Sequence, residues 1–503
     1  MSAVQGRFCG WGFTPLPFML SGGNERRDKP MLFTSMEFLF MFFPLTLGFY
    51  FLLPTKARNY WLLLVSLFFY AWGEPKFVIV MLFSILWNYL MALRIAELEA
   101  GTALRKLVLA IAICVDLGIL FVYKYMNFVT GTIHSLAPGA NIPVTSFVLP
   151  IGISFFTFQS VSYVIDVYRG TPVQKNPAYL GLYIALFPQL IAGPIVRYTT
   201  IEDQINERRV TWEGFCGGML RFLYGFNKKM LLANLLSQAA DAAFGAGTPS
   251  VALAWLGAVC YSLQIFFDFC GYSEMAIGLG EMFGFHFLEN FNYPYISKTV
   301  TEFWRRWHIS LGSWFRDYIY FPLGGSRVDS KWRLVFNLFV VWLATGVWHG
   351  ASWNFIVWGL LYGVLITVEK LLSLPQRLAK PGVAAGLYQV FTLLVVMFGW
   401  VLFRAVDLPS ALIYLRSMFG AAGNALVDDT FRIQFRECFT VLAAGLICST
   451  PIWKLLRERL SARGPSAASV CNGIAYTVQF LLFLAGVSYL VMNAHNPFIY
   501  FNF

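Results

Sequence analysis

Apolar runs recur along this chain with short polar segments between them, and the pattern predicts a series of transmembrane helices. A straight helix needs roughly 20 apolar residues to cross a bilayer. Several of these runs are shorter than that, so we expect a range of roughly 10–12 spans and not a fixed number. The predicted fold class is therefore an all-α polytopic membrane protein. The ten clearest runs are residues 38–53, 60–72, 77–93, 107–123, 251–267, 335–347, 355–368, 387–403, 439–453 and 476–492.

Two further apolar runs, residues 148–167 and 180–195, are interrupted by helix-breaking residues. Irregular backbone at membrane depth is tolerated only where protein or a water-filled cavity covers it. We therefore predict re-entrant or broken helices in both runs, and one more helix near residues 230–244. The breakers are Pro150, Gly152, Pro188, Gly193 and Pro194.

Composition places the chain firmly among membrane proteins. Of its 503 residues, 58% are hydrophobic and only 13% are charged, whereas a soluble domain has about 25% charged residues. The net charge of +11 does not indicate a nucleic-acid partner, because the cytoplasmic loops of membrane proteins carry an excess of Lys and Arg. The partner that the composition indicates is the lipid bilayer.

The distribution of charge predicts the orientation of the chain. Segments 126–165 and 493–503 contain no charged side chain. Because basic loops stay on the cytoplasmic side, we place the basic loops in the cytoplasm and the uncharged segments outside, as in a multi-pass protein of the cytoplasmic (inner) membrane. The basic loops lie at residues 56–58, 94–106, 298–333, 370–380 and 454–463.

The first 30 residues differ from the rest, with a charged run at 25–29 and no long apolar stretch. We interpret residues 1–30 as an N-terminal extension, either disordered or added by an upstream start, and residues 31–503 as one transmembrane domain. The eight cysteines are scattered without metal-ligand or Cys-x-x-Cys spacing. We therefore expect neither a disulfide framework nor a metal site.

The polar segment 301–327 is the first candidate for chemistry. It concentrates charged and imidazole groups among tryptophans and tyrosines, between apolar runs. Such groups are costly in lipid, so a cluster of them beside membrane spans indicates a functional site. Its members are Arg305, Arg306, His308, Arg316 and Asp317.

A second histidine, His349, lies inside the apolar run 334–368. As one helix this run of 35 residues would be about 52 Å long, against a hydrocarbon core of about 30 Å. The run must therefore break, and Gly346, Gly350 and Asn354 mark the place. His349 lies 16 residues beyond Arg333, a rise of about 24 Å. We predict His349 deep in the membrane towards the outer side, and His308 in the cytoplasmic loop or just beneath it, with both facing one passage.

Other polar residues leave alternatives open. Gln264 and Asp268 share one helix face and are either structural partners or substrate ligands. Arg305, Arg306 and Arg316 either set the topology or bind the phosphates of a thioester carrier. Asp317 either orients His308 or pairs with Arg316.

Eight stretches resemble the membrane-bound O-acyltransferase (MBOAT) family, and the resemblance covers residues 31–403. Within the family, the ending PLGGSR favours the branch that acetylates exported polysaccharides such as alginate. The stretches are MLFTSMEFLFMFFPL (31–45), LPIGISFFTFQSVSYVIDVYRG (149–170), FPQLIAGPIVRY (187–198), QIFFDFCGYSEMAIGLG (264–280), NFNYPY (290–295), FWRRWHISL (303–311), WFRDYIYFPLGGSR (314–327) and VWHGASWNFIVWG (347–359).

The resemblance implies an MBOAT-type helical bundle that transfers acetyl groups from a cytoplasmic thioester, acetyl-CoA or another, for O-acetylation of an exported polysaccharide. It implies extracytoplasmic partner acetyltransferases of the SGNH type and no bound cofactor. The family's invariant histidine matches His349, and its second histidine matches His308. The candidates for binding substrate or donor are Arg305, Arg306, Arg316, Asp317, Asp268, Gln264, Tyr272 and Asn354.

The chemistry of a histidine agrees with that role. A hydroxyl needs a positioned base before it can attack a thioester, and neutral imidazole suits this at physiological pH. Burial disfavours the imidazolium form, so His349 is expected to be neutral. Two alternatives remain: transfer of D-alanyl or another acyl group to teichoic acid or lipid, and a non-catalytic acyl or polysaccharide transporter.

Overall fold

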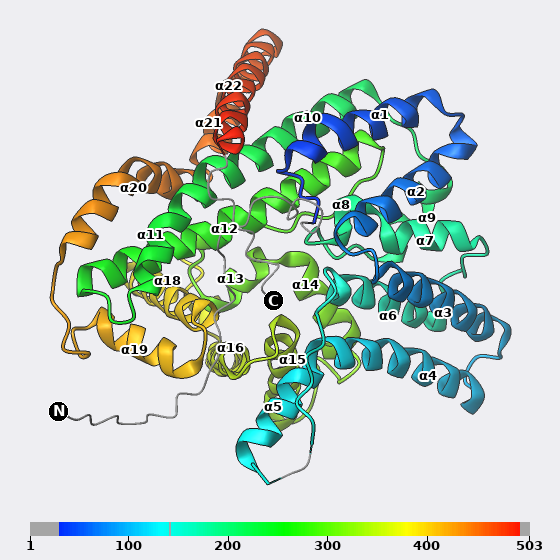
Figure 1. The fold of residues 1–503 in the computed structure, drawn as a ribbon, viewed down its shortest axis with the longest axis horizontal. Coiled ribbons are helices and arrows are strands. Elements are labelled where there is room, and N and C mark those ends of the chain that lie inside the picture. Colours follow the sequence, from blue (N-terminus) through cyan, green and yellow to red (C-terminus); the bar gives the residue numbers. More distant parts are fainter. Residues whose placement is uncertain (1–29, 140–141, 493–503) are drawn as a thin grey trace, which may run out of the picture.

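The computed structural model describes residues 30–139 and 142–492, and within them it consists of helices and connecting loops, with no strand (Figure 1). The N-terminal extension predicted for residues 1–30 lies outside the described residues, apart from Pro30. From Met31 onward the chain belongs to the packed interior, since Met31 and Phe33 are buried. The predicted all-α class is confirmed.

Twenty-two α-helices follow one another along the described chain. They are α1 (Phe43–Leu52), α2 (Thr55–Gly73), α3 (Val78–Glu97), α4 (Ala103–Leu120), α5 (Met126–Leu136), α6 (Ile153–Arg169), α7 (Pro177–Ala185), α8 (Phe187–Leu190), α9 (Tyr198–Asn206), α10 (Trp212–Asn227), α11 (Asn234–Gly245), α12 (Val251–Met282), α13 (Val300–Arg306), α14 (Ile309–Phe315), α15 (Lys331–His349), α16 (Trp353–Leu371), α17 (Leu374–Arg377), α18 (Val383–Arg404), α19 (Leu408–Met418), α20 (Asp429–Cys448), α21 (Ile452–Ser461) and α22 (Pro465–Val491).

Short π-helical turns interrupt this series where a residue is inserted into a helical turn. Turns of this kind are often found at functional sites. They are η2 (Phe38–Phe42), η3 (Phe121–Tyr125), η4 (Lys228–Ala233) and η6 (Arg316–Tyr320), and a 3-10 turn, η5, covers Pro294–Ile296.

Fewer helices than the expected 10–12 are long and apolar enough to cross a membrane by themselves. Six described helices meet both conditions, or seven if α20 and α21, bent by 56°, form one span. Two predicted spans fall short because α2 and α15 begin with basic residues that lower their mean hydropathy. A third, residues 38–53, forms the shorter apolar helix Phe38–Leu52.

The prediction of broken helices holds for the second interrupted run, whereas in the first the breakers lie before one continuous helix, α6. The backbone before α6 turns at Gly152, where φ is 73°. In the second run α7 ends at Ala185, and α8 is only four residues long. Residues 180–196 are buried, so this irregular backbone lies inside the protein and not against lipid.

Two long helices, α10 and α12, form a tightly packed pair. Helix α12 has 32 residues and is about 48 Å long, well beyond the predicted run 251–267. Glycines permit the close approach: a Cβ on Gly225 would lie 2.4 Å from the carbonyl oxygen of Gly271. Asp268 of α12 is tolerated in the interior because Lys229 forms an ion pair with it at 2.7 Å. Both side chains are 2% exposed.

Helices α15 and α16 form a hairpin whose turn is where the sequence predicted a break. The turn comprises residues 350–352. A Cβ on Gly346 would lie 2.4 Å from the carbonyl oxygen of Phe355, so only glycine lets the two helices pack this closely. The hairpin places His349 at the end of α15.

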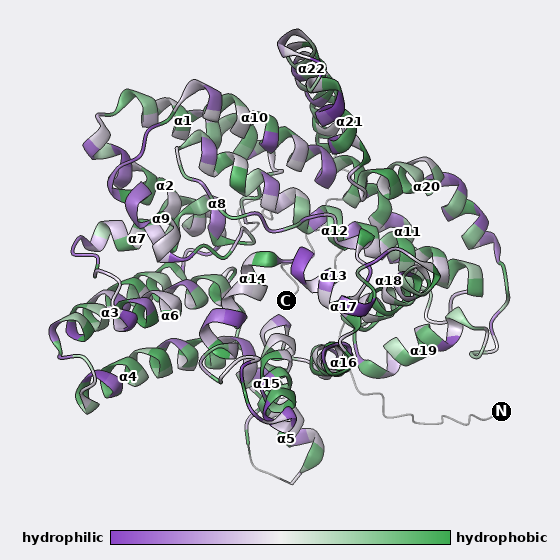
Figure 2. Ribbon diagram, turned by 180° about the vertical axis from the view of Figure 1, so that it is seen from behind, coloured by the Kyte–Doolittle hydropathy of each residue, from purple (hydrophilic) through white to green (hydrophobic). Residues whose placement is uncertain are grey.

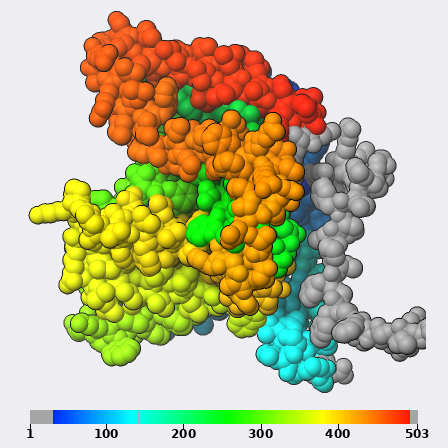
Figure 3. All heavy atoms as spheres, turned by 90° about the vertical axis from the view of Figure 1, so that its left-hand side faces the viewer, coloured from blue at the N-terminus to red at the C-terminus, as the bar shows by residue number. Residues whose placement is uncertain are grey.

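The short helices α13 and α14 lie near the middle of the molecule, with the longer helices around them (Figure 1). Hydrophobic residues follow peripheral helices such as α3 and α4 (Figure 2), many of whose large apolar side chains are exposed. Figure 3 shows α21 and α22 along the upper rim of one face, above the yellow region that contains α18. Exposed apolar side chains on outer helices are expected of a protein surrounded by lipid.

Candidate active site

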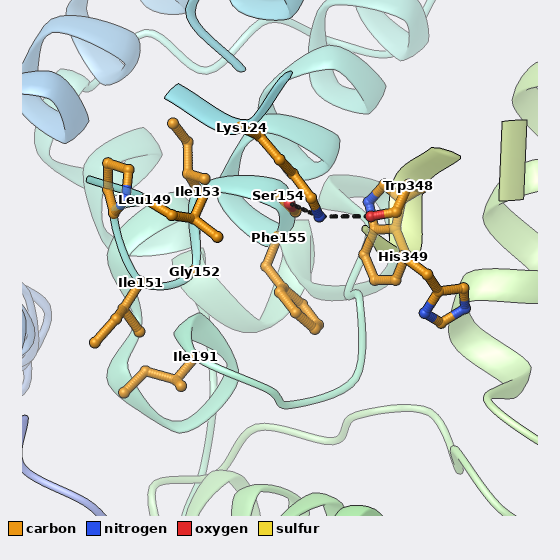
Figure 4. A pocket seen from close by; sticks show the side chains of 11 residues that line it. Lys124, Leu149, Ile151, Gly152, Ile153, Ser154, Phe155, Ile191, Trp348 and His349 are labelled. Carbon is orange, nitrogen blue, oxygen red and sulfur yellow. Dashed lines mark hydrogen bonds between the residues drawn. The ribbon is translucent and has the colours of Figure 1, made fainter. Parts of the chain in front are cut away.

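His349 is the last residue of α15 and is 5% exposed. Its imidazole packs edge-to-face against Trp358 and Phe403, with ring centroids 4.9 and 5.3 Å away. The residue lines a small cavity of about 40 Å³, shown in Figure 4, which the segment 149–155 bounds on the other side. His349 is therefore a buried imidazole at a helix end beside an internal space.

Two side chains from the end of the α4–α5 span hold the end of α15. Lys124 Nζ donates hydrogen bonds to the carbonyl oxygen of Trp348 at 2.5 Å and to Ser154 Oγ at 3.1 Å (Figure 4). The hydroxyl of Tyr125 donates to the carbonyl oxygen of Val347 at 2.9 Å. The last carbonyls of a helix lack partners within the helix, so these two donors satisfy them and orient His349.

Sequence reasoning missed Lys124. It is 7% exposed and lies in η3, where a π-helical turn joins α4 to α5. The available signal was a lone lysine at the outer end of an apolar run, next to the uncharged segment 126–165. A charged group at that depth needs a partner, and the partner is a backbone carbonyl more than 200 positions away, which hydropathy does not reveal.

A second, larger cavity of about 480 Å³ adjoins the first, since Lys124 and Leu149 line both. Its walls include Gly350 and Asn354 from the α15–α16 hairpin, and Gln264 from α12. An ion pair lies on its wall, with Arg404 donating to Asp241 at 2.7 Å. A cavity of this volume is within the range of small-molecule sites.

His308, which was predicted in the cytoplasmic loop or just beneath it, is buried within the protein between α13 and α14: only 2% of the residue is exposed. Its ring packs edge-to-face on Phe269 of α12 at 4.6 Å and lies 6.1 Å from the ring of Trp348, between centroids. Trp348 also contacts His349, at 5.1 Å. One indole thus connects the two histidines. His308 is covered by protein because α13 and α14 lie near the middle of the molecule, with the longer helices around them (Figure 1).

Desolvation is the main influence on the pKa of His308. Burial lowers the pKa of His308 well below its usual value, and the nearby His349 lowers it further. The ring is therefore neutral at physiological pH. Its Nδ1 lies 3.0 Å from Asn290 Oδ1, and Nε2 has no hydrogen-bond partner among the described residues.

The charged residues of segment 301–327 do not gather around His308. Arg305 is exposed, and Arg306 pairs with Glu302 at 2.9 Å. Arg316 bonds Asp317 at 2.8 Å, and Arg197 reaches the same carboxylate at 2.6 Å. Of the two roles open for Asp317, pairing with Arg316 is the one the structure contains.

The environment of Asp317 stabilises its charge. Partial burial alone would raise the pKa of Asp317, but the hydrogen bond from Arg316 and the charge of Arg197 outweigh it and leave the pKa below its usual value. Tyr318 continues the network by donating to Asp166 Oδ2 at 2.7 Å. The cluster therefore ties α6, the segment before α9 and η6 together.

The remaining candidates differ in their surroundings. Asp268 belongs to the buried pair with Lys229 described above, and Tyr272 stacks on Phe33 with centroids 4.5 Å apart. Gln264 and Asn354 line the larger cavity, and Asn354 also donates to the carbonyl oxygen of Ala405 at 2.8 Å. Within the described ranges, no three His, Cys, Asp or Glu side chains are grouped so that they could hold a metal ion.

Fold and site together define a class: a multi-pass helical membrane protein that encloses two buried histidines, one of which, His349, lies beside a cavity. The MBOAT model, described as the membrane-bound O-acyltransferase family, matches residues 175–405. The chain belongs to this family, and it is an O-acyltransferase.

Several relatives extend the similarity over nearly the whole chain. The probable alginate O-acetylase AlgI of Azotobacter vinelandii is 38% identical over 504 residues, covering 94% of this chain and 100% of that protein. The protein of the same description from Pseudomonas aeruginosa is 44% identical over 452 residues, covering 88% and 86%. The peptidoglycan O-acetyltransferase of Helicobacter pylori is 32% identical over 518 residues, covering 94% and 98%.

Proposed function

We propose that this protein moves acetyl groups from a cytoplasmic thioester for O-acetylation of an exported, alginate-like polysaccharide, with His349 as the general base. The observation that carries this proposal is the buried imidazole of His349 at a helix end held by Lys124 and Tyr125, beside an internal space. The relatives with the widest coverage are described as O-acetyl transfer proteins for alginate and peptidoglycan. That shared chemistry favours acetyl as the acyl group and a carbohydrate hydroxyl as its destination.

The reaction needs one proton acceptor and one leaving group. The acceptor hydroxyl gives its proton to the imidazole as its oxygen bonds to the thioester carbonyl carbon. The carbon–sulfur bond then breaks, and the leaving thiolate takes that proton from the imidazolium, which restores the neutral base. General-base assistance contributes about 10²–10⁴-fold, so positioning and stabilisation of the oxyanion supply the rest.

The two sides of the site suit different reactants. With the basic loops in the cytoplasm, the larger cavity with Arg404 and Asp241 opens towards the outer side, which suits the acceptor. Gln264 and Asn354 on its walls offer the amide groups that recognise hydroxyls. Donor phosphates approach from the cytoplasmic side, where Arg305 and Arg316 are exposed.

Three further features belong to the same proposal. The protein lies in the inner membrane, and acetyl-CoA or another acyl thioester is the donor. Extracytoplasmic SGNH-type acetyltransferases are the partners that complete the transfer to the polymer. The alternatives are D-alanyl transfer to teichoic acid or lipid, and transport without catalysis.

Replacing His349 tests the proposal. A His349→Ala strain is expected to secrete polymer in normal amount but without the acetyl signal in its proton NMR spectrum. His134→Ala is the matched control, because His134 is exposed and far from the site along the chain, and it should leave acetylation unchanged.

Other outcomes would select the alternatives. Full acetylation in a well-expressed His349→Ala strain contradicts the base assignment. Loss of polymer secretion indicates a transporter, and loss of ester-linked D-alanine from the envelope indicates D-alanyl transfer.

A further inference from the structure

The hydrogen bonds of Asn290 determine how His308 carries its proton. Asn290 lies in the loop between α12 and α13 and is 1% exposed. Its side-chain oxygen accepts from the backbone N–H of Ser310 at 3.2 Å and from Ser310 Oγ at 2.9 Å. The same oxygen lies 3.0 Å from His308 Nδ1. One amide oxygen is therefore shared by three neighbours.

This arrangement leaves one choice for the imidazole. The backbone N–H of Ser310 can only donate, so the Asn290 atom facing it is the amide oxygen and not the nitrogen. An oxygen that cannot donate requires that Nδ1 of His308 carry the hydrogen. In a neutral ring only one nitrogen is protonated, so Nε2 keeps its lone pair.

The surrounding backbone holds this geometry in place. His308 has φ 46° and ψ 54°, a left-handed conformation that is uncommon for a residue other than glycine. The backbone N–H of Ile309 donates to the carbonyl oxygen of Asn290 at 3.0 Å, and Ser310 Oγ accepts from the backbone N–H of Ile195 at 3.0 Å. Three segments far apart in sequence thus converge on one imidazole.

We propose that Asn290 is a positioning residue of the acyltransferase site, which locks His308 in the Nδ1–H tautomer and so leaves Nε2 as a hydrogen-bond acceptor within the site. The inference rests on the proposed function, because it assigns His308 a part in that reaction beside His349. It goes further because it names Asn290 as the positioning residue and Nε2 of His308 as the acceptor atom.

The electrostatic surroundings agree with a neutral ring. His308 is faced by Phe269 on α12 and Trp348 on α15, which are uncharged. The titratable group that acts on it is His349, also on α15. The charged residue next to Phe269 in sequence, Asp268, is paired with Lys229. Nothing in this set favours a proton on Nε2.

Solid-state NMR of ¹⁵N-histidine-labelled protein in lipid tests the tautomer without any need for activity. The His308 signals are those missing from a His308→Gln sample. At neutral pH we expect a neutral ring protonated at Nδ1, and Asn292→Leu, an exposed residue of the same loop, should not change it. A ring protonated at Nε2, or doubly protonated, overturns the proposal whatever the fate of acetyl transfer.

Acetylation of the exported polymer in cells tests the catalytic consequence. With protein amounts matched by immunoblot, Asn290→Leu is expected to reduce polymer acetyl content about tenfold or more, since misplacement of a catalytic group commonly costs up to 10²-fold. Asn290→Asp, which keeps an acceptor oxygen, should restore part of it, and Asn292→Leu should behave as wild type.

The two tests separate the possible failures. Wild-type acetylation in Asn290→Leu, with the expected tautomer in wild-type protein, shows that the tautomer is not used in the reaction and overturns the inference while leaving His349 untouched. Persistence of acetylation in His349→Ala contradicts the proposed function itself.

Discussion

At the scale of single residues, Lys124 shows how a polar side chain can be kept inside an apolar protein. Its ammonium group binds the carbonyl oxygen of Trp348 and Ser154 Oγ, so it supplies a donor where a helix end exposes acceptors. Removal of one partner from a buried hydrogen bond leaves the other unsatisfied, at a cost of about 1–3 kcal/mol. The position of His349 therefore depends on Lys124, which binds the carbonyl oxygen of the preceding residue, Trp348.

Lys124→Met is expected to reduce acetyl content of the polymer about ten- to hundredfold, because His349 loses its fixed position. Tyr125→Phe removes only the hydroxyl bond to Val347, and should cost about 0.5–1.5 kcal/mol of stability with a smaller loss of transfer. Thermal unfolding in detergent and NMR of the polymer measure the two effects. Equal activity of Lys124→Met and wild type would show that the lysine does not position the site.

At the scale of secondary-structure elements, the α15–α16 hairpin is the part on which the site depends most. Gly346 faces the backbone of α16, and a Cβ added there would lie only 2.4 Å from the carbonyl oxygen of Phe355, which is a steric clash. Because backbone cannot yield as a side chain does, the two helices must separate to admit even one methyl group. Overpacking of this kind typically costs about 1–3 kcal/mol.

Gly346→Ala should therefore lower the melting temperature and the acetyl content of the polymer together. The matched control is Gly386→Ala in α18, where nothing lies within 4 Å of the added Cβ. Alanine is the better helix former by about 0.5–1 kcal/mol, so the control should be neutral or more stable. Similar behaviour of both variants would contradict the close-packing argument.

At the scale of the whole molecule, the cluster around Asp317 ties together α6, the segment before α9 and η6. The pKa of Asp317 is lowered in the folded protein, so its charge contributes stability above the unfolded pKa of about 3.9. That contribution is lost as the pH falls through the folded pKa. Asp317→Asn should therefore lower the melting temperature at pH 7, and the difference from wild type should shrink as the pH approaches 3.

Asp329→Asn serves as the control for this change, because Asp329 is an exposed carboxylate in the loop that follows. It should melt as wild type does at both pH values. A difference between Asp317→Asn and wild type that is the same at pH 7 and pH 3 would show that the ion pairs do not stabilise the fold.

Much of the architecture could be read from local sequence, and the exceptions share one cause. Apolar runs predicted the helical class, and the length of run 334–368 predicted a break after His349, because both follow from the thickness of a bilayer. Lys124 and the contacts of His308 with Asn290 and Phe269 were missed because their partners lie in other elements. A hydropathy pattern reports the burial of a segment but not which backbone carbonyl or amide it will meet.

The small volume beside His349 affects how much of the acyl donor is lost to hydrolysis. Water is a competing nucleophile for any activated acyl group, and a space of about 40 Å³ has room for only about three water molecules. Exclusion of bulk water from a reacting centre suppresses such side reactions. Under the proposed function, the close walls of this small cavity limit hydrolysis of the donor from that side, so that more of the acyl group ends in the ester bond of the product.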